Sequence, residues 1–317
     1  MKKKLWLLAL FLLVFVGGVV YHASLPEPTG PAQGVSLEGQ VEHAPPQRRT
    51  LRIATFNVHG GKGRDGQRDL GRVAGCLVGL DFVALNEVHG PALWQPEDQL
   101  EQLGEQLGMA WLFAPASRTW YHVDFGNALV TALPVSFWQR IPLAHQSHHG
   151  LRNAVLVGLQ FQGRTVHVLL THISRQDDAE RQAQLRAVIA LFRSLAEPAI
   201  LLGDLNSNAD DPQIRELLAI PGVADPVGEI LAAKSPGKGL PERIDWIITR
   251  GLQGVDAEIH DCGESDHPLI WAELELTPPP GKDGGPAPPV QPEPGQPVQP
   301  IEPEPDMAPI GPVGISG

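Results

Sequence analysis

The segment AILLGDLNSNAD, residues 199–210, joins an uninterrupted apolar run to a series of polar residues. A short apolar run bounded by turn-forming residues is typical of a buried strand. Asp204 and Asn206 come at the end of this run, where a hydrophobic core has no use for a carboxylate or a carboxamide. They form either a simple Asx turn or part of a functional site.

The same pattern recurs along the chain, because several apolar strands end in polar side chains. The residues concerned are Asn57 after RIATF, Glu87 after DFVALN, His172 after HVLLT, Asp245 within RIDWII, and Asp266 and His267 before PLIWAEL. Each residue alone is better explained by a turn or a cap than by a functional role. Glu87 is the least easily explained in this way, since an acid after an apolar run is costly to bury unless it is paired, hydrated or bound to a metal. Together, these positions predict one convergent site at a shared sheet edge.

Helical patterns separate the predicted strands. Amphipathic spacing predicts helices over residues 68–80, 97–108 and 177–196, and the last of these has acids at its start and arginines later. Strands are also predicted over residues 127–135 and 154–161. This mixture predicts an α/β (α+β) fold in which two mixed sheets pack face to face with helices outside.

Composition and charge restrict the class of protein. The chain has 317 residues, of which 42% are hydrophobic, and this is enough for a substantial core. Its net charge is -12, and its Lys and Arg residues are scattered, so the basic surface of a strong duplex binder is missing. A metal-dependent nuclease can still be acidic overall. Cys76 and Cys262 lie far apart in sequence and are expected either to form a disulfide or to be two small buried residues.

The two ends of the chain differ from its middle. Residues 1–21 place three lysines before an apolar run, which predicts a signal peptide or signal anchor and a folded domain exported to the periplasmic or extracellular side. An uncleaved membrane anchor is favoured because no pair of small residues marks a cleavage site, and cleavage would give a secreted protein. Residues 22–50 are predicted to be a tether, and the Pro-rich, acidic residues 277–317 a disordered tail. The folded domain is therefore predicted over residues 51–276.

Motifs spread over the predicted domain resemble those of the endonuclease/exonuclease/phosphatase superfamily, the deoxyribonuclease I-like metal-dependent phosphoesterases. In chain order they are TFNVHGGKGRDGQRDLGRVA, DFVALNEV, GNALVTALPV, LLTHIS, LLGDLNSNADD, RIDWIIT and SDHPLIWAEL. Several motifs in the correct order are far more specific than any one of them. The resemblance implies a four-layer α/β/β/α sandwich with the active site at the strand ends.

The resemblance also implies a metal site and a set of catalytic groups. Glu87 would be the main metal-binding carboxylate with Asn57 beside it, and Asp266 would lie near the metal or the attacking water. Such oxygen ligands suit Mg²⁺ or Mn²⁺ better than zinc. Asp204 would orient or deprotonate the attacking water, and Asn206 would hold that water or the phosphate.

Further roles follow from the same resemblance. His267, oriented by Asp245, would either hydrogen-bond the phosphate or act as the base. His172 and Arg152 would contact the phosphate from the opposite side, and the guanidinium fork of Arg152 matches two phosphate oxygens. Asn127 is expected to support the site and to help bind the substrate phosphate.

The chain departs from the pattern of the superfamily at two places. Relatives often have Gln where this chain has Asn86, a change that leaves the adjacent Glu87 intact. His59 stands where some nuclease relatives carry an acid, which puts a second carboxylate-based metal site in doubt. His59 is expected either to contact substrate or to be a solvated loop residue. A separate cluster, made of His145, His148 and His149, is expected to be a solvated loop.

The predicted function is divalent-metal-dependent hydrolysis of a phosphodiester, and a phospholipid-like substrate is favoured by the predicted anchor. The alternatives are an extracellular nuclease and an inactive binding module on the same fold. No obligate protein partner is evident. The loops expected to select the substrate, residues 91–98, 115–125 and 228–241, carry no diagnostic pattern.

Overall fold

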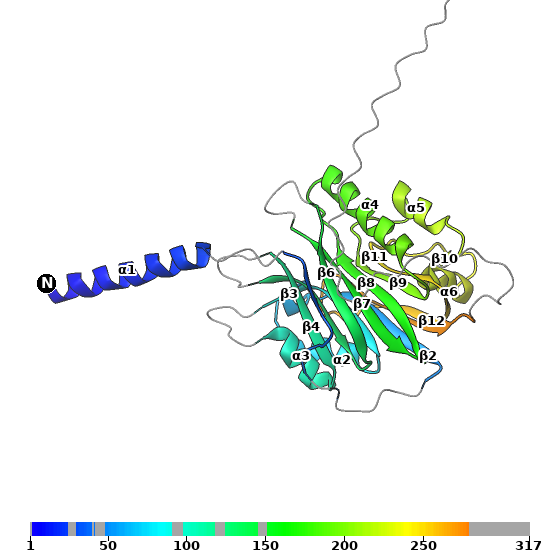
Figure 1. Cartoon of the computed structure of the whole chain (residues 1–317), viewed down its shortest axis with the longest axis horizontal. Helices are drawn as coiled ribbons and strands as arrows, with labels where there is room; N and C mark the ends of the chain where they lie inside the picture. Colours follow the sequence, from blue (N-terminus) through cyan, green and yellow to red (C-terminus); the bar gives the residue numbers. More distant parts are fainter. Residues whose placement is uncertain are drawn as a thin grey trace, which may run out of the picture.

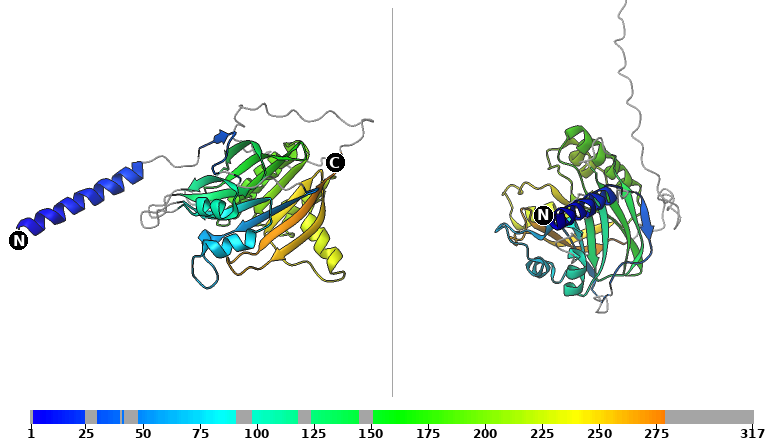
Figure 2. Two further views of the ribbon diagram at one scale, coloured as in Figure 1. Left: turned by 90° about the horizontal axis from the view of Figure 1, so that it is seen from below. Right: turned by 90° about the vertical axis from the view of Figure 1, so that its left-hand side faces the viewer.

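Two packed β-sheets form the centre of the molecule in a computed structural model, which describes residues 2–24, 30–39, 41, 48–90, 98–117, 124–144 and 151–278. In the left view of Figure 2 the green strands of one sheet lie over the blue and orange strands of the other. Sheet A has the strand order β1 (Ala32–Gly34), β6 (Val135–Pro142), β7 (Asn153–Phe161), β8 (Arg164–His172), β9 (Ala199–Asp204), β11 (Asp245–Arg250) and β10 (Val223–Ala224). Sheet B has the order β12 (Leu252–His260), β13 (Leu269–Leu276), β2 (Thr50–Asn57), β3 (Phe82–His89), β5 (Phe125–Thr131) and β4 (Ala110–Ser117).

Helices cover the outer faces of the two sheets (Figure 1). On sheet B, α2 (Leu70–Leu77) and α3 (Gln99–Leu107) share one apolar cluster with β2, β3 and β5. On sheet A, α4 (Asp178–Ser194) and α5 (Pro212–Leu218) share a second cluster with β8 and β9. A third cluster fills the space between the sheets. The predicted four-layer α/β/β/α sandwich is therefore confirmed.

Every helix from α2 to α6 (Pro226–Lys234) begins directly after an aspartate whose carboxylate accepts a backbone N–H of the first turn. Such caps satisfy donors that have no partner within the helix. The sequence predicted α2, α3 and α4 but not α5 or α6. Both of these helices begin with the dipeptide Asp-Pro, a start signal that could have revealed them.

Part of the predicted tether of residues 22–50, namely residues 30–39, contributes to the folded domain, which differs from the expectation of a free linker. β1 pairs with β6 at the edge of sheet A, and Glu38 forms a bridge with Trp111 of sheet B. Gly34 and Gly39 allow the chain to lie against Trp138 and Trp111, because a Cβ at either position would collide with the indole ring. Small residues thus permit this segment to pack on both sheets.

The N-terminal apolar segment forms α1 (Lys2–Ser24), which extends away from the sandwich (Figure 1). The membrane span expected for residues 1–21 is not supported, since none of the helices formed by the described residues is long and apolar enough to cross a membrane. The tail was predicted over residues 277–317, and residues 279–317 of it lie outside the described part of the chain.

The two cysteines pack against the same apolar cluster beneath α2 and α3. Both are free thiols, so the alternative of a disulfide is not realised in this structure. Burial, followed by a hydrogen bond with Cys262, raises the pKa of the Cys76 thiol to about 12.

Candidate active site

The candidate site lies where parallel strand pairs from both sheets end. β2 runs parallel to β3 with Asn57 opposite Asn86, and β8 runs parallel to β9 with His172 opposite Asp204. Asn57 Nδ2 donates to Asp204 Oδ2 across the sheet interface at 3.2 Å. The carboxyl ends of these four strands therefore meet at one edge, as the sequence predicted.

Asp204, Asp245 and His267 form a compact group of titratable side chains at this edge. Asp245 lies opposite Asp204 in the β9–β11 pairing, and His267 Nδ1 is 2.7 Å from Asp245 Oδ2. The other imidazole nitrogen, His267 Nε2, is 3.9 Å from Asp204 Oδ2. Both carboxylates are almost fully buried, and one atom of each of the three side chains lies within 4.8 Å of the others.

The surroundings raise the pKa values of Asp204 and His267 above their ordinary values. Burial and the charge of Asp245 raise the pKa of Asp204 to about 7. Burial lowers the pKa of His267, but the hydrogen bond to Asp245 and the charges of Asp245, Asp204 and Asp266 outweigh it and raise the pKa to about 9. At pH 8, Asp204 is therefore largely ionised and His267 largely protonated.

His172 connects this group to Glu87. Its Nε2 lies 3.6 Å from Asp204 Oδ2 and 4.0 Å from Glu87 Oε1. Burial, together with the charges of Arg152, His267 and Arg175, holds the pKa of His172 well below its ordinary value, so the ring is neutral at pH 7. A neutral imidazole between two carboxylates can donate one hydrogen bond at Nε2.

A bulge in β3 places Glu87 at the site. The pairing of β3 with β5 shifts between Leu85 and Val88, and Glu87 has a φ of 58°. A positive φ is unusual for a residue other than glycine and costs conformational energy. The bulge leaves the Glu87 side chain 28% exposed at the strand end.

Arg152 supplies positive charge beside these acids. Burial lowers its pKa, and the charges of Glu87 and Asp204 oppose that effect. Its Nε is buried without a hydrogen-bond partner among the described residues. One of its terminal nitrogens donates to the Leu151 carbonyl, and the guanidinium lies 6.0 Å from the Phe125 ring centroid.

The predicted asparagines make mainly structural contacts. The Asn206 N–H donates to Asp204 Oδ1, and Asn206 Nδ2 donates to the Ile173 carbonyl. The Asx turn considered from the sequence is thus present, and it forms part of the site edge. Asn57 Oδ1 accepts the His59 N–H, and Asn127 Nδ2 donates to the backbone and side chain of Asn153.

Asp266 lies at the exposed rim, with its carboxylate 3.4 Å from His59 Nδ1. The preceding residue, Ser265, is fully buried and donates to the Asn57 carbonyl at 2.6 Å. Ser265 was missed as a supporting residue, although it stands within the SDHP motif. Asn86 was noted only as a departure from the pattern and Asn153 was not singled out, yet both lie directly beneath the site.

The donor set suits a hard divalent cation. The predicted ligands Glu87, Asn57 and Asp266 all offer oxygen, which Mg²⁺ and Mn²⁺ prefer. The compact group of Asp204, Asp245 and His267 is a second set of donor atoms, none of which was predicted as a ligand, and His267 can offer a nitrogen to a cation there only in its unprotonated form. Asp245 Oδ1 is buried there and has no hydrogen-bond partner within the described part of the chain. The residues therefore fit a metal-dependent site.

Several predicted features fall elsewhere. His145, His148 and His149 lie outside the described residues, as do residues 91–97 and 118–123 of the expected substrate loops.

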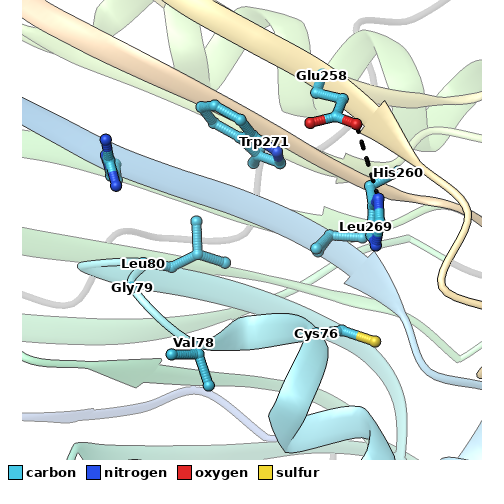
Figure 3. Close-up of a pocket in the computed structure, with 9 residues that line it drawn as sticks. Cys76, Val78, Gly79, Leu80, Glu258, His260, Leu269 and Trp271 are labelled. Carbon is cyan, nitrogen blue, oxygen red and sulfur yellow. Dashed lines mark ion pairs between the residues drawn. The ribbon is translucent and has the colours of Figure 1, made fainter.

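A separate pocket of about 240 Å³ lies between the end of α2 and strands β12 and β13 (Figure 3). It is lined by residues such as Cys76, Glu258 and Trp271 and includes none of the candidate site residues.

Comparisons with known proteins agree with this architecture. The model of the Endonuclease/Exonuclease/phosphatase family matches residues 54–267. An endonuclease/exonuclease/phosphatase from Beutenbergia cavernae has 25% identity and a TM-score of 0.58, with 73% of this chain and 72% of that chain covered. The catalytic domain of human Nocturnin with bound sulfate has 15% identity and a TM-score of 0.59, over 80% of this chain and all of that chain (100%). D. rerio TDP2 with a single-strand DNA product has 21% identity and a TM-score of 0.52, with 72% of this chain and 99% of that chain covered.

Proposed function

The chain belongs to the endonuclease/exonuclease/phosphatase family of phosphoester hydrolases, and from this membership we propose that it hydrolyses a phosphodiester with the help of a divalent cation. The observation that carries the proposal is the contact of Asp204, Asp245 and His267 at the strand ends. Two of these groups have pKa values of about 7 and about 9. Titratable groups perturbed in this way are typical of catalytic sites.

In the proposed reaction, Asp204 orients the attacking water and takes its proton. The water oxygen forms the new bond to phosphorus while the bond to the leaving oxygen breaks. A base is most effective when its pKa lies near the working pH, and the pKa of Asp204 meets that condition. The rigid end of β9 supports the role because a one-ångström displacement of a catalytic group can be costly.

His267 acts as a hydrogen-bond donor to the phosphate in this proposal. Its pKa of about 9 means that the ring is protonated at neutral pH, which favours the donor role over the role of base. Asp245 holds Nδ1 and leaves Nε2 to face Asp204 and the substrate. Arg152 would bind phosphate oxygens from the opposite side, and His172 would donate from Nε2.

Glu87 and Asn57 would hold the cation, with Asp266 close by. A bound divalent cation neutralises negative charge that develops on the phosphoryl group. Mg²⁺ and Mn²⁺ are both consistent with oxygen ligands.

The preferred substrate is a small or lipid-borne phosphodiester. The net charge of -12 and the scattered basic residues oppose strong binding of a nucleic acid polyanion. The TDP2 structure with a single-strand DNA product shares the fold, and DNA cleavage is accordingly included as an outcome of the test below.

The location is a separate proposal: residues 1–21 direct the chain across the cytoplasmic membrane. The support is the sequence alone, in which lysines precede an apolar run. The mass of the mature N-terminus and the activity in cell fractions test it, and full activity confined to the cytoplasm would contradict it.

The proposed activity is tested with the full chain, Mg²⁺ or Mn²⁺, and three substrates in parallel: a chromogenic phosphodiester, phospholipid vesicles and plasmid DNA. We expect hydrolysis of the diester that chelator abolishes. We also expect that Asp204→Asn and His267→Ala each lower the rate by about 100-fold or more. Asp210→Asn, at an exposed position of the same loop, is the matched control and should keep the wild-type rate.

Each pattern of results has a distinct meaning. Hydrolysis of plasmid DNA but not of the other two substrates would select the nuclease. Chelator-resistant hydrolysis would contradict metal dependence. The absence of hydrolysis on all three substrates would reject the proposed phosphodiesterase.

A further inference from the structure

Three buried asparagines form a continuous chain of amide hydrogen bonds beneath the candidate site. They are Asn86 on β3, Asn127 on β5 and Asn153 on β7, and none is more than 2% exposed. A buried carboxamide is costly unless its polar groups are paired. Apolar side chains would fill the same space without this requirement, so packing alone does not account for the three residues.

The chain of hydrogen bonds begins at the backbone of Asp204. The Asp204 N–H donates to Asn86 Oδ1 at 3.1 Å, and Asn86 Nδ2 donates to Asn127 Oδ1 at 2.8 Å. Asn127 Nδ2 donates to Asn153 Oδ1 at 3.0 Å, and Asn153 Nδ2 donates to two backbone carbonyls of β4. β7 and β9 belong to sheet A, whereas β3, β4 and β5 belong to sheet B. The chain therefore ties the two sheets together directly below the strand ends.

Backbone partners fix the orientation of each carboxamide. The Asp204 N–H can only donate, so it must face the oxygen of Asn86. The Thr171 carbonyl can only accept, so it must face the nitrogen of Asn86, which lies 3.2 Å away. In the same way, the Asn153 carbonyl accepts from Asn127 Nδ2 at 2.9 Å. The network has one arrangement, and a fully satisfied buried network of this kind confers rigidity.

Asn86 is the member of this network that links the site residue of sheet A, Asp204, to the site residue of sheet B, Glu87. Its side chain holds the backbone of Asp204 in sheet A, and its own peptide continues into Glu87 in sheet B. A single residue thus joins the proposed base to the predicted metal ligand. A shift of one sheet relative to the other would have to break these hydrogen bonds.

Resting on the proposed function, we propose that Asn86 is a positioning residue that fixes Asp204 relative to Glu87, and that Asn127 and Asn153 hold Asn86 in place. Asn86 acts through Asp204 and Glu87 and does not itself contact the substrate. Its removal should impair the chemical step more than substrate binding, since the groups that bind the phosphate remain.

The test compares Asn86→Ala with Thr131→Ala in the full chain. Thr131 is an equally buried polar residue of sheet B, and it binds backbone groups at the opposite end of β5, so it serves as a control for loss of stability. Amide hydrogen exchange of Asp204, followed by NMR in the presence of chelator, reports the contact without requiring activity. We expect exchange of this amide to become about tenfold faster or more in Asn86→Ala, which is the scale of a lost buried hydrogen bond. We expect no change at Asp204 in Thr131→Ala.

Steady-state kinetics supply the second measurement. We expect kcat of Asn86→Ala to fall by about 10- to 100-fold with KM within about threefold of wild type, as for a misplaced catalytic group. Thr131→Ala should retain its kcat. Wild-type exchange at Asp204 in Asn86→Ala, or a kcat equal to that of the control, would overturn the proposal.

The outcomes separate this proposal from the proposed function. An inactive wild-type chain would reject the phosphodiesterase, and amide exchange would still decide whether Asn86 holds Asp204. If Asn86→Ala does not fold, Asn127→Ala takes its place, because it removes the support of Asn86 but keeps the contact with Asp204. We then expect the same changes at smaller size, and unchanged exchange and kcat would overturn the proposal.

Discussion

The carboxyl group of Asp204 is subject to influences that move its pKa in opposite directions. Burial and Asp245 raise the pKa to about 7, whereas His267 and the hydrogen bonds from Asn206 and Asn57 lower it. Asp245 also raises the pKa of His267 through a hydrogen bond and its charge. One buried acid therefore influences both groups whose protonation matters for the proposed reaction.

This coupling predicts the pH dependence of the wild type and of Asp245→Asn. Activity should rise through about pH 7 as Asp204 loses its proton and fall through about pH 9 as His267 loses its own. Asp245→Asn removes a charge that raises both pKa values, so both limbs should move to lower pH by about 1 unit or more. A profile of kcat/KM from pH 5 to 10 checks this, with Asp210→Asn as the control. Limbs that move in opposite directions would contradict the assignment.

The raised pKa of Asp204 also predicts that the ionised carboxylate needed for the proposed reaction destabilises the folded protein. Its folded pKa lies above the ordinary value of 3.8, so its contribution to stability is complete below pH 3.8 and is lost as the pH rises through about 7. With chelator present, Asp204→Asn should therefore raise Tm at pH 8 by at least about 2 °C, and the gain should shrink at pH 5. Calorimetry at the two pH values measures the difference. An equal or lower Tm at pH 8 would show that the ionised carboxylate is not destabilising.

At the scale of single residues, the sequence predicted the side chains that follow strands but, apart from Asn127, not those that support them. Asp204 and His267 stand out because a polar residue at a strand end is visible in a local pattern. Asn86 carries no such signal, since its partners lie on β5, β8 and β9 and are brought close only by the packing of the two sheets. Ser265 was missed for the same reason, because its partner is a carbonyl of β2.

At the scale of elements, the segment between β12 and β13 determines where His267 lies. Ser265 Oγ donates to the Asn57 carbonyl, and the Ser265 carbonyl accepts from Arg64 Nε at 3.2 Å. The Arg64 N–H donates to the Gly263 carbonyl at 3.1 Å. These contacts hold the segment to the end of β2 and to the loop that follows it.

Ser265→Ala should loosen this segment. The change leaves the Asn57 carbonyl without its hydroxyl donor, so we expect a loss of stability of about 1–2 kcal/mol. We also expect kcat to fall by about tenfold, because His267 is less accurately held. Urea denaturation and kinetics measure the two effects. Asp177→Ala, which removes the cap of α4, is a control that should cost about 1 kcal/mol with kcat unchanged.

The elements themselves were predictable to different degrees. Long periodic or continuous apolar segments, such as those of α4, β8 and β9, were predicted correctly. β4, β6 and β12 were not predicted as separate strands, and partly buried residues interrupt the buried pattern of each. Such strands owe their position to pairing with distant segments, which a local pattern does not encode.

At the scale of the whole molecule, the segment before the sandwich completes the two sheets. β1 lies at the edge of sheet A, and Trp138 Nε1 donates to the Ser36 carbonyl. Trp111 exchanges backbone hydrogen bonds with Glu38. The composition of residues 22–50 suggested a linker because such contacts depend on the docking surface and leave no periodic pattern in the segment itself.

Truncation tests this arrangement. A chain that begins at residue 48 should lose the cover of Trp111 and Trp138, with a fall in Tm of about 4 °C or more and a red shift of tryptophan fluorescence. A chain that begins at residue 25 retains β1 and should match the full-length protein in both measurements. Equal Tm values for the two truncated chains would contradict the inferred contribution of β1.

The bulge in β3 makes the number of residues in that strand matter as much as their identity. Phe82 and Ala84 face the core between the sheets, whereas Val83, Leu85 and Val88 face the helices. The alternation of inward and outward side chains therefore resumes out of phase after Glu87. Deleting one residue here would restore regular pairing with Val88 still facing the helices, but Asn86 and Glu87 could not then both keep their present positions. Insertions and deletions at this point should thus be far less tolerated than substitutions, because the bulge fixes the spacing of residues along β3.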